Sequence, residues 1–304
     1  MNMKKIILFV CFVSLIFGVS KAQQVPQFSQ NMFNKLANNP AVAGSAESIN
    51  ATVLHRSQWM GFDGAPTTLN LSVEGPIPIL NGGLGLNIVS DAIAEYSNLG
   101  IQLSYAYQTD LGHGQLGIGA SAGMFQSGLD GGNLNPADPE NFATESGSAM
   151  DFGGGLYYNT QDVYIGLSSL HITEPTIENN ENIIDLSRHY FLLAGYNHEI
   201  DPLLSLNPSI YLKSDGSTSQ LDINTIVQYN MQDNKKLWGG VSYRLDEGII
   251  LLTGMNLNKD LKFGISYDVV LSKIQNNSIE FMLGYSFSVE TDKPVRSYKN
   301  PRYL

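Results

Sequence analysis

Apolar and polar residues alternate along most of the chain, most regularly near its C-terminal end. In residues 261–272 the odd positions are Leu, Phe, Ile, Tyr, Val and Leu, whereas the even positions are Lys, Gly, Ser, Asp, Val and Ser. Residues 279–289 repeat the pattern, and 99–107 and 221–229 resemble it. Because a period of two residues sends alternate side chains to opposite faces of a strand, these segments predict β-strands with one apolar and one largely polar face.

The whole region from 49 to 290 reads as a succession of such strands. We identify fourteen segments, near 49–59, 66–74, 82–90, 96–109, 114–127, 149–159, 162–170, 187–199, 203–214, 218–230, 235–245, 248–257, 260–273 and 277–290. An even number of strands is what a closed bacterial outer-membrane barrel requires.

The composition of the two faces separates a membrane barrel from a soluble β-sandwich. In the four most regular segments the apolar face carries no charge and ends in aromatic residues such as Tyr107, Tyr229 and Tyr285. An arginine or lysine at the bilayer midplane of such a face costs roughly 2 to 4 kcal/mol, and aromatic side chains favour the lipid headgroups. The opposite face is rich in Ser, Gly, Asn and Gln, too polar for a packed core. The fold class predicted is therefore all-β, a transmembrane antiparallel β-barrel of about 14 strands.

The lengths of the connections predict which end of the barrel faces outward. The two longest, 128–148 and 171–186, follow the fifth and seventh segments and so fall on the same side. Connections on the other side, such as 111–113 and 258–259, are short. Outer-membrane barrels have long external loops and short periplasmic turns, so both chain ends are expected at the periplasmic side.

The first residues predict a secretory signal peptide, 1–22, because Lys4 and Lys5 precede an apolar run that ends at Ser20-Lys21-Ala22. The run is too short for a membrane-spanning helix, and it contains the chain's one cysteine, Cys11. Removing this peptide takes away three basic and no acidic residues, so the net charge falls from −11 to −14. So acidic a chain is an unlikely fit for nucleic acid, and it has no thiol for a disulfide.

The two ends of the mature chain are predicted to lie in the periplasm. Residues 23–48 lack strand periodicity, and Phe28, Met32, Phe33 and Leu36 at near-helical spacing predict a short amphipathic helix that stops before Pro40. The tail, 291–304, is basic. Candidates for periplasmic contact are Phe28, Phe33, Lys293, Arg296, Lys299 and Arg302. A solvated tail without a partner is the alternative.

Motifs that resemble catalytic sites lack the structural context that they need. Gly119-Ala120-Ser121-Ala122-Gly123 matches the G-x-S-x-G nucleophile motif but lies within an alternating strand, whereas that motif needs a sharp turn into a helix. Residues 112–117 match G-x-G-x-x-G without a following helix and read as a hairpin turn. The five histidines show no ligand spacing. We therefore predict no enzyme, no cofactor and no metal site.

Acidic residues are concentrated in the two long external connections, which contain no lysine or arginine. The candidates for contact with a partner there are Asp130, Asp138, Glu140, Glu145, Glu174, Glu178 and Glu181. Oxygen-rich loops suit calcium, but no EF-hand spacing is present, so a solvated surface that faces a partner is the preferred interpretation.

The segment RSQWMGFDGAPTT, residues 56–68, connects the first two predicted strands. Its glycines and proline are explained by a turn. A turn does not require Arg56, Trp59 or Asp63, and these three are candidates either for fixing the loop against the lumen or for contact with an exported partner.

Three ordered blocks, PQFSQNMFN at 26–34, NPAVAG at 39–44 and RSQWMGFDGAPTT at 56–68, together with YKNPRYL at the C-terminus, resemble the PorP/SprF family. Members of that family are outer-membrane proteins of the type IX secretion and gliding-motility apparatus of Bacteroidetes. The resemblance implies a fourteen-stranded barrel that handles or anchors a secreted surface protein, often a large adhesin with a C-terminal sorting domain, and connects it to periplasmic components.

The leading hypothesis is a non-enzymatic binding and assembly protein in contact with an exported partner, periplasmic components and outer-membrane lipid. The alternative is an outer-membrane channel or transporter for small or hydrophobic solutes, suggested by the polar inward face. A third hypothesis, an outer-membrane hydrolase, depends on Ser121 alone. The sequence leaves the oligomeric state, the identity of the partner and the closure of the lumen open.

Overall fold

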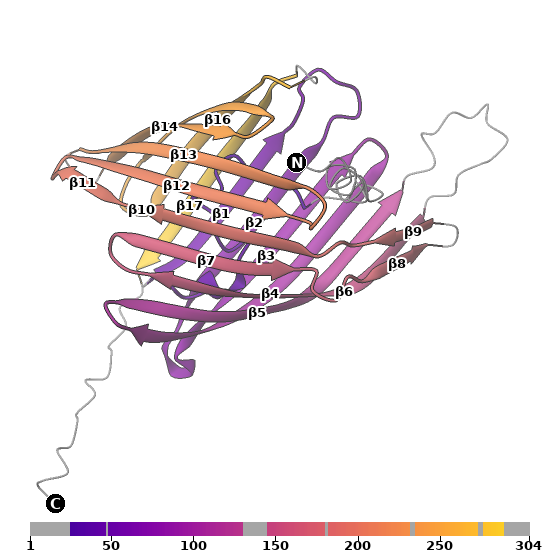
Figure 1. Cartoon of the computed structure of the whole chain (residues 1–304), viewed down its shortest axis with the longest axis horizontal. Helices are drawn as coiled ribbons and strands as arrows, with labels where there is room; N and C mark the ends of the chain where they lie inside the picture. Colours follow the sequence, from indigo (N-terminus) through magenta and orange to yellow (C-terminus); the bar gives the residue numbers. More distant parts are fainter. Residues whose placement is uncertain are drawn as a thin grey trace, which may run out of the picture.

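The computed structural model describes residues 25–46, 48–129, 145–179, 182–231, 235–272 and 276–288. It is a closed antiparallel barrel (Figure 1). Its strands are β1 (Ser48–Ser57), β2 (Thr67–Ile77), β3 (Gly82–Ile93), β4 (Tyr96–Leu111), β5 (Gly114–Leu129), β6 (Glu145–Asn159), β7 (Val163–Leu170), β10 (His189–Tyr196), β11 (His198–Asp201), β12 (Leu204–Ser214), β13 (Ser219–Asn230), β14 (Lys236–Arg244), β15 (Gly248–Asn256), β16 (Leu261–Val270) and β17 (Ser278–Ser288).

Closure is achieved at two junctions. The first and last strands pair from Ser48↔Ser288 to Ser57↔Ile279, and β10 pairs with both β7 and β12. Since β10 and β11 both pair with β12, they form one interrupted strand, and the barrel has fourteen strands. The prediction of a fourteen-stranded antiparallel barrel is confirmed, and every predicted segment coincides with a strand of it.

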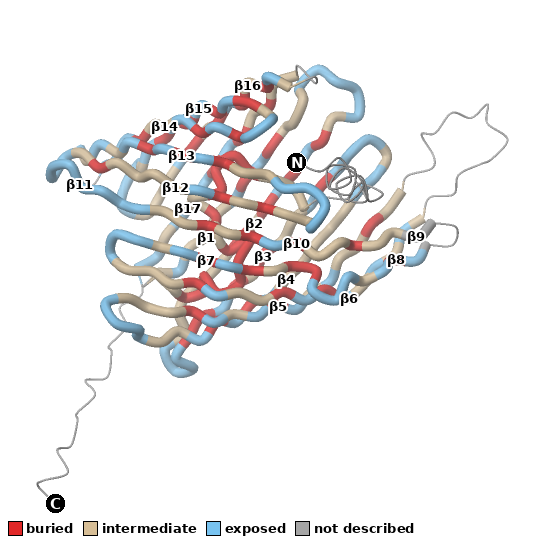
Figure 2. The backbone as a smooth tube through the Cα atoms, viewed as in Figure 1, coloured by how far each residue is buried: buried red, intermediate tan, exposed pale blue. Residues whose placement is uncertain are grey.

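The barrel wall has its apolar side outward. On β16 the side chains of Phe263 and Tyr267 are exposed, while the inward Ser266 and Asp268 are buried. The same alternation runs along the other strands (Figure 2). Tyr107, Tyr229 and Tyr285 are outward and exposed, as the sequence pattern predicts. An apolar exterior around a polar interior is the arrangement that a lipid environment requires.

The two longest connections, β5–β6 and β7–β10, lie at one end of the barrel, which also carries short ones such as the β3–β4 turn. The connection between β7 and β10 carries a separate hairpin of β8 (Thr176–Asn179) and β9 (Asn182–Asp185), which extends beyond the wall (Figure 1). Two-residue turns join β4 to β5 and β11 to β12 at the opposite end. By the rule for outer-membrane barrels, the end with the hairpin is external, and the opposite end is periplasmic.

Residues 25–46, which we call the head, lie inside the barrel, where most of their side chains are buried. The expected amphipathic helix is wrong. Residues 29–33 and 36–38 form turns, and the head's one helical element is the 3₁₀ helix η1 (Pro40–Val42). Polar lumen side chains satisfy the head's backbone and side chains, so a helix is not needed for that purpose. The short 3₁₀ helix η2 (Pro78–Leu80) forms a periplasmic turn. Within the described ranges, no helix is long and apolar enough to cross a membrane.

Candidate functional site

The head runs through the lumen from the external end to the periplasmic end. The Val25 carbonyl accepts a hydrogen bond from Lys213 Nζ at 3.0 Å, and the Val25 N–H lies 3.4 Å from His189 Nε2. Both partners lie at the external ends of their strands. Near the middle, Asn34 Nδ2 donates to Ser72 Oγ at 2.9 Å. The position of Val25 corrects the expectation that residues 23–48 lie in the periplasm.

Five charged side chains in the external half of the lumen hold the head. We call them the buried ion cluster, and they are Arg56 on β1, Asp222 on β13, Arg244 on β14, Asp268 on β16 and Glu280 on β17. Arg56 lies 2.7 Å from Asp268 and 3.5 Å from Glu280. Arg244 lies 3.0 Å from Asp222 and 3.5 Å from Asp268. Charges removed from water remain ionised only when they are paired and hydrogen-bonded, so these groups depend on each other.

Ser29 is the point at which the head enters this cluster. Its hydroxyl donates to Asp268 Oδ2 at 2.7 Å and accepts from an Arg56 guanidinium nitrogen at 2.6 Å. The N–H groups of Ser29 and Gln30 donate to the two oxygens of Glu280 at 2.8 and 2.9 Å. Charge-assisted hydrogen bonds of this kind are about twice as strong as neutral ones. The cluster therefore fixes the head as well as the wall.

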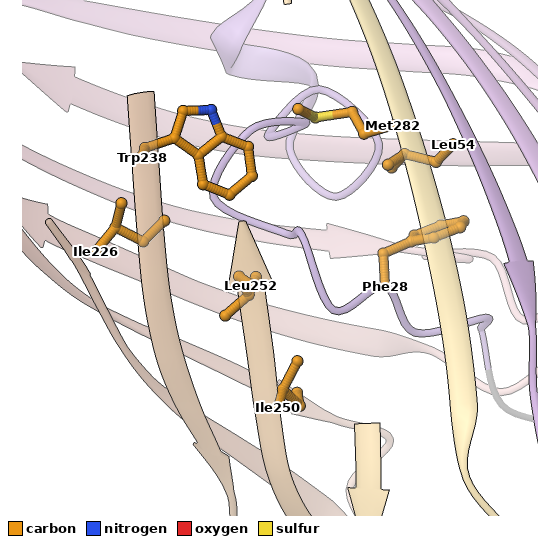
Figure 3. Close-up of a cluster of buried hydrophobic side chains, with 7 residues drawn as sticks. All are labelled: Phe28, Leu54, Ile226, Trp238, Ile250, Leu252 and Met282. Carbon is orange, nitrogen blue, oxygen red and sulfur yellow. The ribbon is translucent and has the colours of Figure 1, made fainter. Parts of the chain in front are cut away.

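The neighbouring head residues strengthen the same attachment. Gln27 Nε2 lies 3.2 Å from both oxygens of Asp222, and Asn31 Nδ2 donates to the same carboxylate at 3.3 Å. Phe28 packs between them into an apolar cluster with Leu54, Ile226, Trp238, Ile250, Leu252 and Met282 (Figure 3). The block PQFSQN thus alternates polar contacts to the ion cluster with one buried ring.

The position of Phe28 corrects the prediction that it contacts a periplasmic partner, whereas the same contact for the half-buried Phe33 stays a prediction. Phe28 is 6% exposed. Phe33 packs against Trp238 with ring centroids 4.6 Å apart, and Lys262 Nζ lies 4.9 Å from its ring centroid. The spacing that suggested a helix reflects instead the need to fill gaps among inward strand side chains. Burying a ring of this size stabilises the docked head by roughly 1.5 to 3 kcal/mol.

The block NPAVAG docks the head at the periplasmic end. Asn39 Oδ1 accepts from the Ala41 N–H at 2.9 Å, and Asn39 Nδ2 donates to the Leu156 carbonyl at 3.0 Å. The turn approaches the wall so closely that a Cβ added at Gly119 would lie 2.4 Å from Ala41 Cα. Glycine is needed at this strand position because the head backbone occupies the place of a side chain.

Arg56, a candidate for contact with an exported partner or for fixing the loop against the lumen, lies with its side chain in the lumen. It is 2% exposed and reaches only inward groups. The following loop, 58–66, packs against a second external connection, since the N–H of Trp59 donates to Ser278 Oγ at 3.1 Å and that of Met60 to the Asn277 carbonyl at 2.8 Å. Trp59 adopts a left-handed φ of 50° and is half-buried, whereas Asp63 and Phe62 are exposed.

Only some of the acidic loop candidates are among the residues that the structure describes. Glu145 begins β6 and is half-buried, Glu178 is exposed on β8, and the exposed Glu174 lies 3.9 Å from Arg188. Residues Asp130, Asp138, Glu140 and Glu181 lie outside the described residues, as do the signal peptide and the tail candidates Lys293, Arg296, Lys299 and Arg302.

Sequence reasoning missed Ser29, Asp222, Arg244, Asp268 and Glu280. A signal was present, because all four charged residues occupy inward positions near the external ends of strands, where an unpaired charge would be costly. It also missed His171, whose Nδ1 lies 2.9 Å from Asp151 Oδ1 and whose ring centroid is 5.8 Å from that of His189. No group of three or more potential metal ligands occurs among the described residues.

Ser121 lies on the inward face of the straight strand β5, paired with Gly153. The G-x-S-x-G match therefore lacks the strained turn that exposes a nucleophilic serine. Residues 112–113 form a hairpin turn, as predicted.

Comparisons with known structures agree with the fold. The monoaromatic hydrocarbon channel CymD superposes with a TM-score of 0.54 at 14% sequence identity, over 90% of this chain and 96% of that one. The toluene transporter TbuX from Ralstonia pickettii gives a TM-score of 0.48 at 13% identity, over 83% of this chain and 92% of that one. At 14% identity the likeness to CymD shows the fold alone.

No match was found among curated proteins. The sequence profile of the family described as type IX secretion system membrane protein PorP/SprF matches residues 20–287, which covers most of the chain. Two of the three blocks that suggested this resemblance form the head, and the third supplies Arg56, which contacts Ser29 of the first block. The chain belongs to the PorP/SprF family of type IX secretion system membrane proteins.

Proposed function

We propose that this protein is a non-enzymatic outer-membrane barrel that binds a secreted surface protein at its external rim and links it to periplasmic components of the type IX system. The bound protein is adhesin-like and is recognised by its C-terminal sorting domain. The barrel helps to export it or anchors it at the cell surface.

The observation that carries this proposal is the head fixed in the lumen by the buried ion cluster. A lumen filled by the protein's own chain suits a scaffold that presents loops better than an open path for diffusion. External loops held by a rigid wall are the usual place for binding residues in such a scaffold. The exposed Met60 and Phe62 offer apolar contact area beside Asp63 and Trp59.

The acidic candidates complete the proposed external site. They are Asp130, Asp138, Glu140, Glu145, Glu174, Glu178 and Glu181, all of which belong to the two long connections predicted to be external. They favour a partner surface that carries basic groups. On the periplasmic side, the tail residues Lys293, Arg296, Lys299 and Arg302 remain candidates for contact with an acidic periplasmic component.

Replacement of residues 131–144 by a short Gly-Ser linker tests the external site. The replacement ends before Glu145, so β6 keeps its full length. We expect the barrel to insert normally, as judged by its electrophoretic mobility before heating, while the surface protein appears in the medium. Exchange of the periplasmic turn Asn258-Lys259 for Asn-Gly serves as the control and should leave display unchanged. Intact display after the loop replacement contradicts the proposal.

The alternative, a channel or transporter for small or hydrophobic solutes, predicts a different result in planar bilayers. A continuous path would give steady single-channel conductance with the purified protein. The head-filled lumen leads us to expect little or none. A steady open pore in the unmodified protein would favour transport over anchoring.

A further inference from the structure

A second feature of the lumen lies on the periplasmic side of the head. It is a cavity of about 630 Å³, which we call the vestibule. Its inner wall is formed by head residues 32–36, and its outer wall includes the periplasmic ends of β6, β7 and β17. Thr160, Gln161 and Asp162 of a periplasmic turn also line it, so it opens toward the periplasm. Its volume is in the range of sites that bind ligands, roughly 300 to 1,000 Å³.

Three lysines line the vestibule, from three separate elements. Lys35 belongs to the head, Lys236 begins β14 and Lys262 lies on β16. Among the described residues, no carboxylate forms an ion pair with any of them. The arginines of the lumen are paired, as described for the buried ion cluster. The lining also includes two carboxylates, those of Glu74 and Asp162, so lysines outnumber carboxylates by three to two.

Two of these ammonium groups lie over aromatic rings, which do not accept the hydrogen bonds that the groups can donate. Lys35 Nζ lies 4.3 Å from the centroid of Tyr164, and Lys262 Nζ lies 4.9 Å from that of Phe33. Cation–π contacts of this type contribute about 0.5 to 2 kcal/mol, but a ring face is a poor substitute for an anionic hydrogen-bond acceptor. Each ammonium group can donate three hydrogen bonds. The lysines are thus positioned for an anionic ligand.

Of the two acidic side chains that line the vestibule, Asp162 is exposed, and Glu74 is half-buried and already hydrogen-bonded. Glu74 accepts hydrogen bonds from the Gly44 N–H at 2.8 Å and from Asn50 Nδ2 at 2.7 Å.

Lys35 belongs to the head and not to a membrane-spanning strand. Burial lowers the pKa of its ammonium group to about 8. The charge of Lys262 acts in the same direction and that of Glu74 opposes it. An incoming carboxylate would offset this cost of a buried positive charge.

Two further lysines lie beside the vestibule, at an end of the barrel that also carries Asp110, Asp162, Asp201 and Asp260. Lys235 and Lys259 are exposed on the turns next to Lys236 and Lys262. Like the vestibule lysines, they have no ion pair among the described residues. Together with Lys236 and Lys262 they place four positive charges on the turns and strand ends of β14–β16, whereas Asp162 lies on the β6–β7 turn. The β14–β16 side of the mouth therefore attracts an acidic segment.

We propose that the vestibule binds an extended, carboxylate-bearing segment of a periplasmic protein, with Lys35, Lys236 and Lys262 pairing with its acidic groups. The spread of the lysines over three elements favours several charges along a peptide over one small anion, which would leave most of the cavity unfilled. That the ligand is a segment of a protein rests on the proposed function. That the ligand carries carboxylates rests on the residues of the vestibule alone.

The test uses the full mature protein in detergent and a fluorescent peptide, Glu-Tyr-Glu-Trp-Glu, with its glutamine analogue as the neutral probe. Fluorescence anisotropy measures binding at low and high salt. We expect the acidic peptide to bind, the neutral one to bind weakly, and the double variant Lys236→Gln/Lys262→Gln to lose affinity on the order of tenfold. The matched control, Lys235→Gln/Lys259→Gln, removes the same charge from the same end outside the cavity and should change affinity little.

Three results would overturn the proposal. They are an equal loss in the two double variants, equal binding of the neutral peptide, and complete displacement of the peptide by inorganic phosphate, which would indicate a small-anion site. Mobility before heating confirms that each variant is folded. The outcome is separable from the external-loop experiment, because loss of display there together with no peptide binding here would reject the vestibule site and leave the proposed function standing.

Discussion

The backbone N–H of Ser29 donates a 2.8 Å hydrogen bond to Glu280, a residue 251 positions away on the last strand of the barrel. The same carboxylate accepts the N–H of Gln30 and lies 3.5 Å from Arg56 on the first strand. One side chain thus joins the head, the first strand and the last. Its removal should affect all three.

Glu280→Ala is expected to lower the free energy of unfolding by about 3 kcal/mol or more, because Arg56 loses a partner and two head N–H groups lose their acceptor in a buried site. The temperature at which the folded band disappears in gel electrophoresis reports this change. Glu178→Ala, on the exposed hairpin, should stay within about 0.5 kcal/mol of the unmodified protein. Equal shifts in the two variants would show that the cluster does not stabilise the fold.

The close approach of the head to β5 makes a second prediction. Gly119→Ala introduces a Cβ 2.4 Å from Ala41 Cα, so either the head or the strand must move, at a cost of about 1 to 3 kcal/mol. Gly284→Ala is a suitable control, because the atom nearest to its new Cβ would be Lys262 Cβ at 3.6 Å. The two variants are compared by their thermal stability and by the resistance of the head to proteases. A head that docks loosely would tolerate the two substitutions equally.

The path of the head predicts that its two ends are accessible from opposite sides of the membrane. The mature chain is expected to contain no cysteine, so single cysteines can be introduced at Val25 and at Ala46. A thiol reagent that does not cross the outer membrane should label Val25→Cys on intact cells. It should reach Ala46→Cys only after permeabilisation. The reverse order of labelling would mean that the barrel has the opposite orientation.

A disulfide can test whether the head stays in place during secretion. Asn34 and Ser72 side chains meet at 2.9 Å, so cysteines at these two positions should link the head to β2 under oxidising conditions. Since we propose that the head is a fixed part of the scaffold, we expect the linked protein to display its surface partner normally. Loss of display that reductant restores would show that the head must move.

The wall of the barrel was predictable from the sequence because its physical cause is local. Successive side chains of each strand point alternately to lipid and to the lumen, so every segment shows a period of two residues, as in 261–272. The even strand number and the lengths of the connections then determine closure and sidedness. Tyr107 and Tyr285 occupy outward positions for the same reason.

The interior was not predictable in the same way because its partners are distant in sequence. Nothing in the spacing of Ser29, Arg56 and Asp268 indicates that they meet, since their contact depends on which strands become neighbours after closure. The head itself has no period, because its backbone and polar groups are satisfied by lumen side chains instead of by a helix or a sheet. Its apparent helical spacing was therefore misleading at Phe28 and Phe33. Among the predicted site residues, Arg56 was singled out because a turn does not require an arginine. Its contacts with Ser29 and Asp268 in the lumen explain why it is there.

The pairing of Arg56 with Glu280 across the β1–β17 junction has a consequence for biogenesis. The head can acquire its full set of partners only after the last strand has arrived beside the first. Contacts this distant in sequence form late and slowly. A chain truncated before β17 would therefore lack Glu280, the acceptor for the Ser29 and Gln30 N–H groups, and its N-terminal segment would be held by fewer contacts.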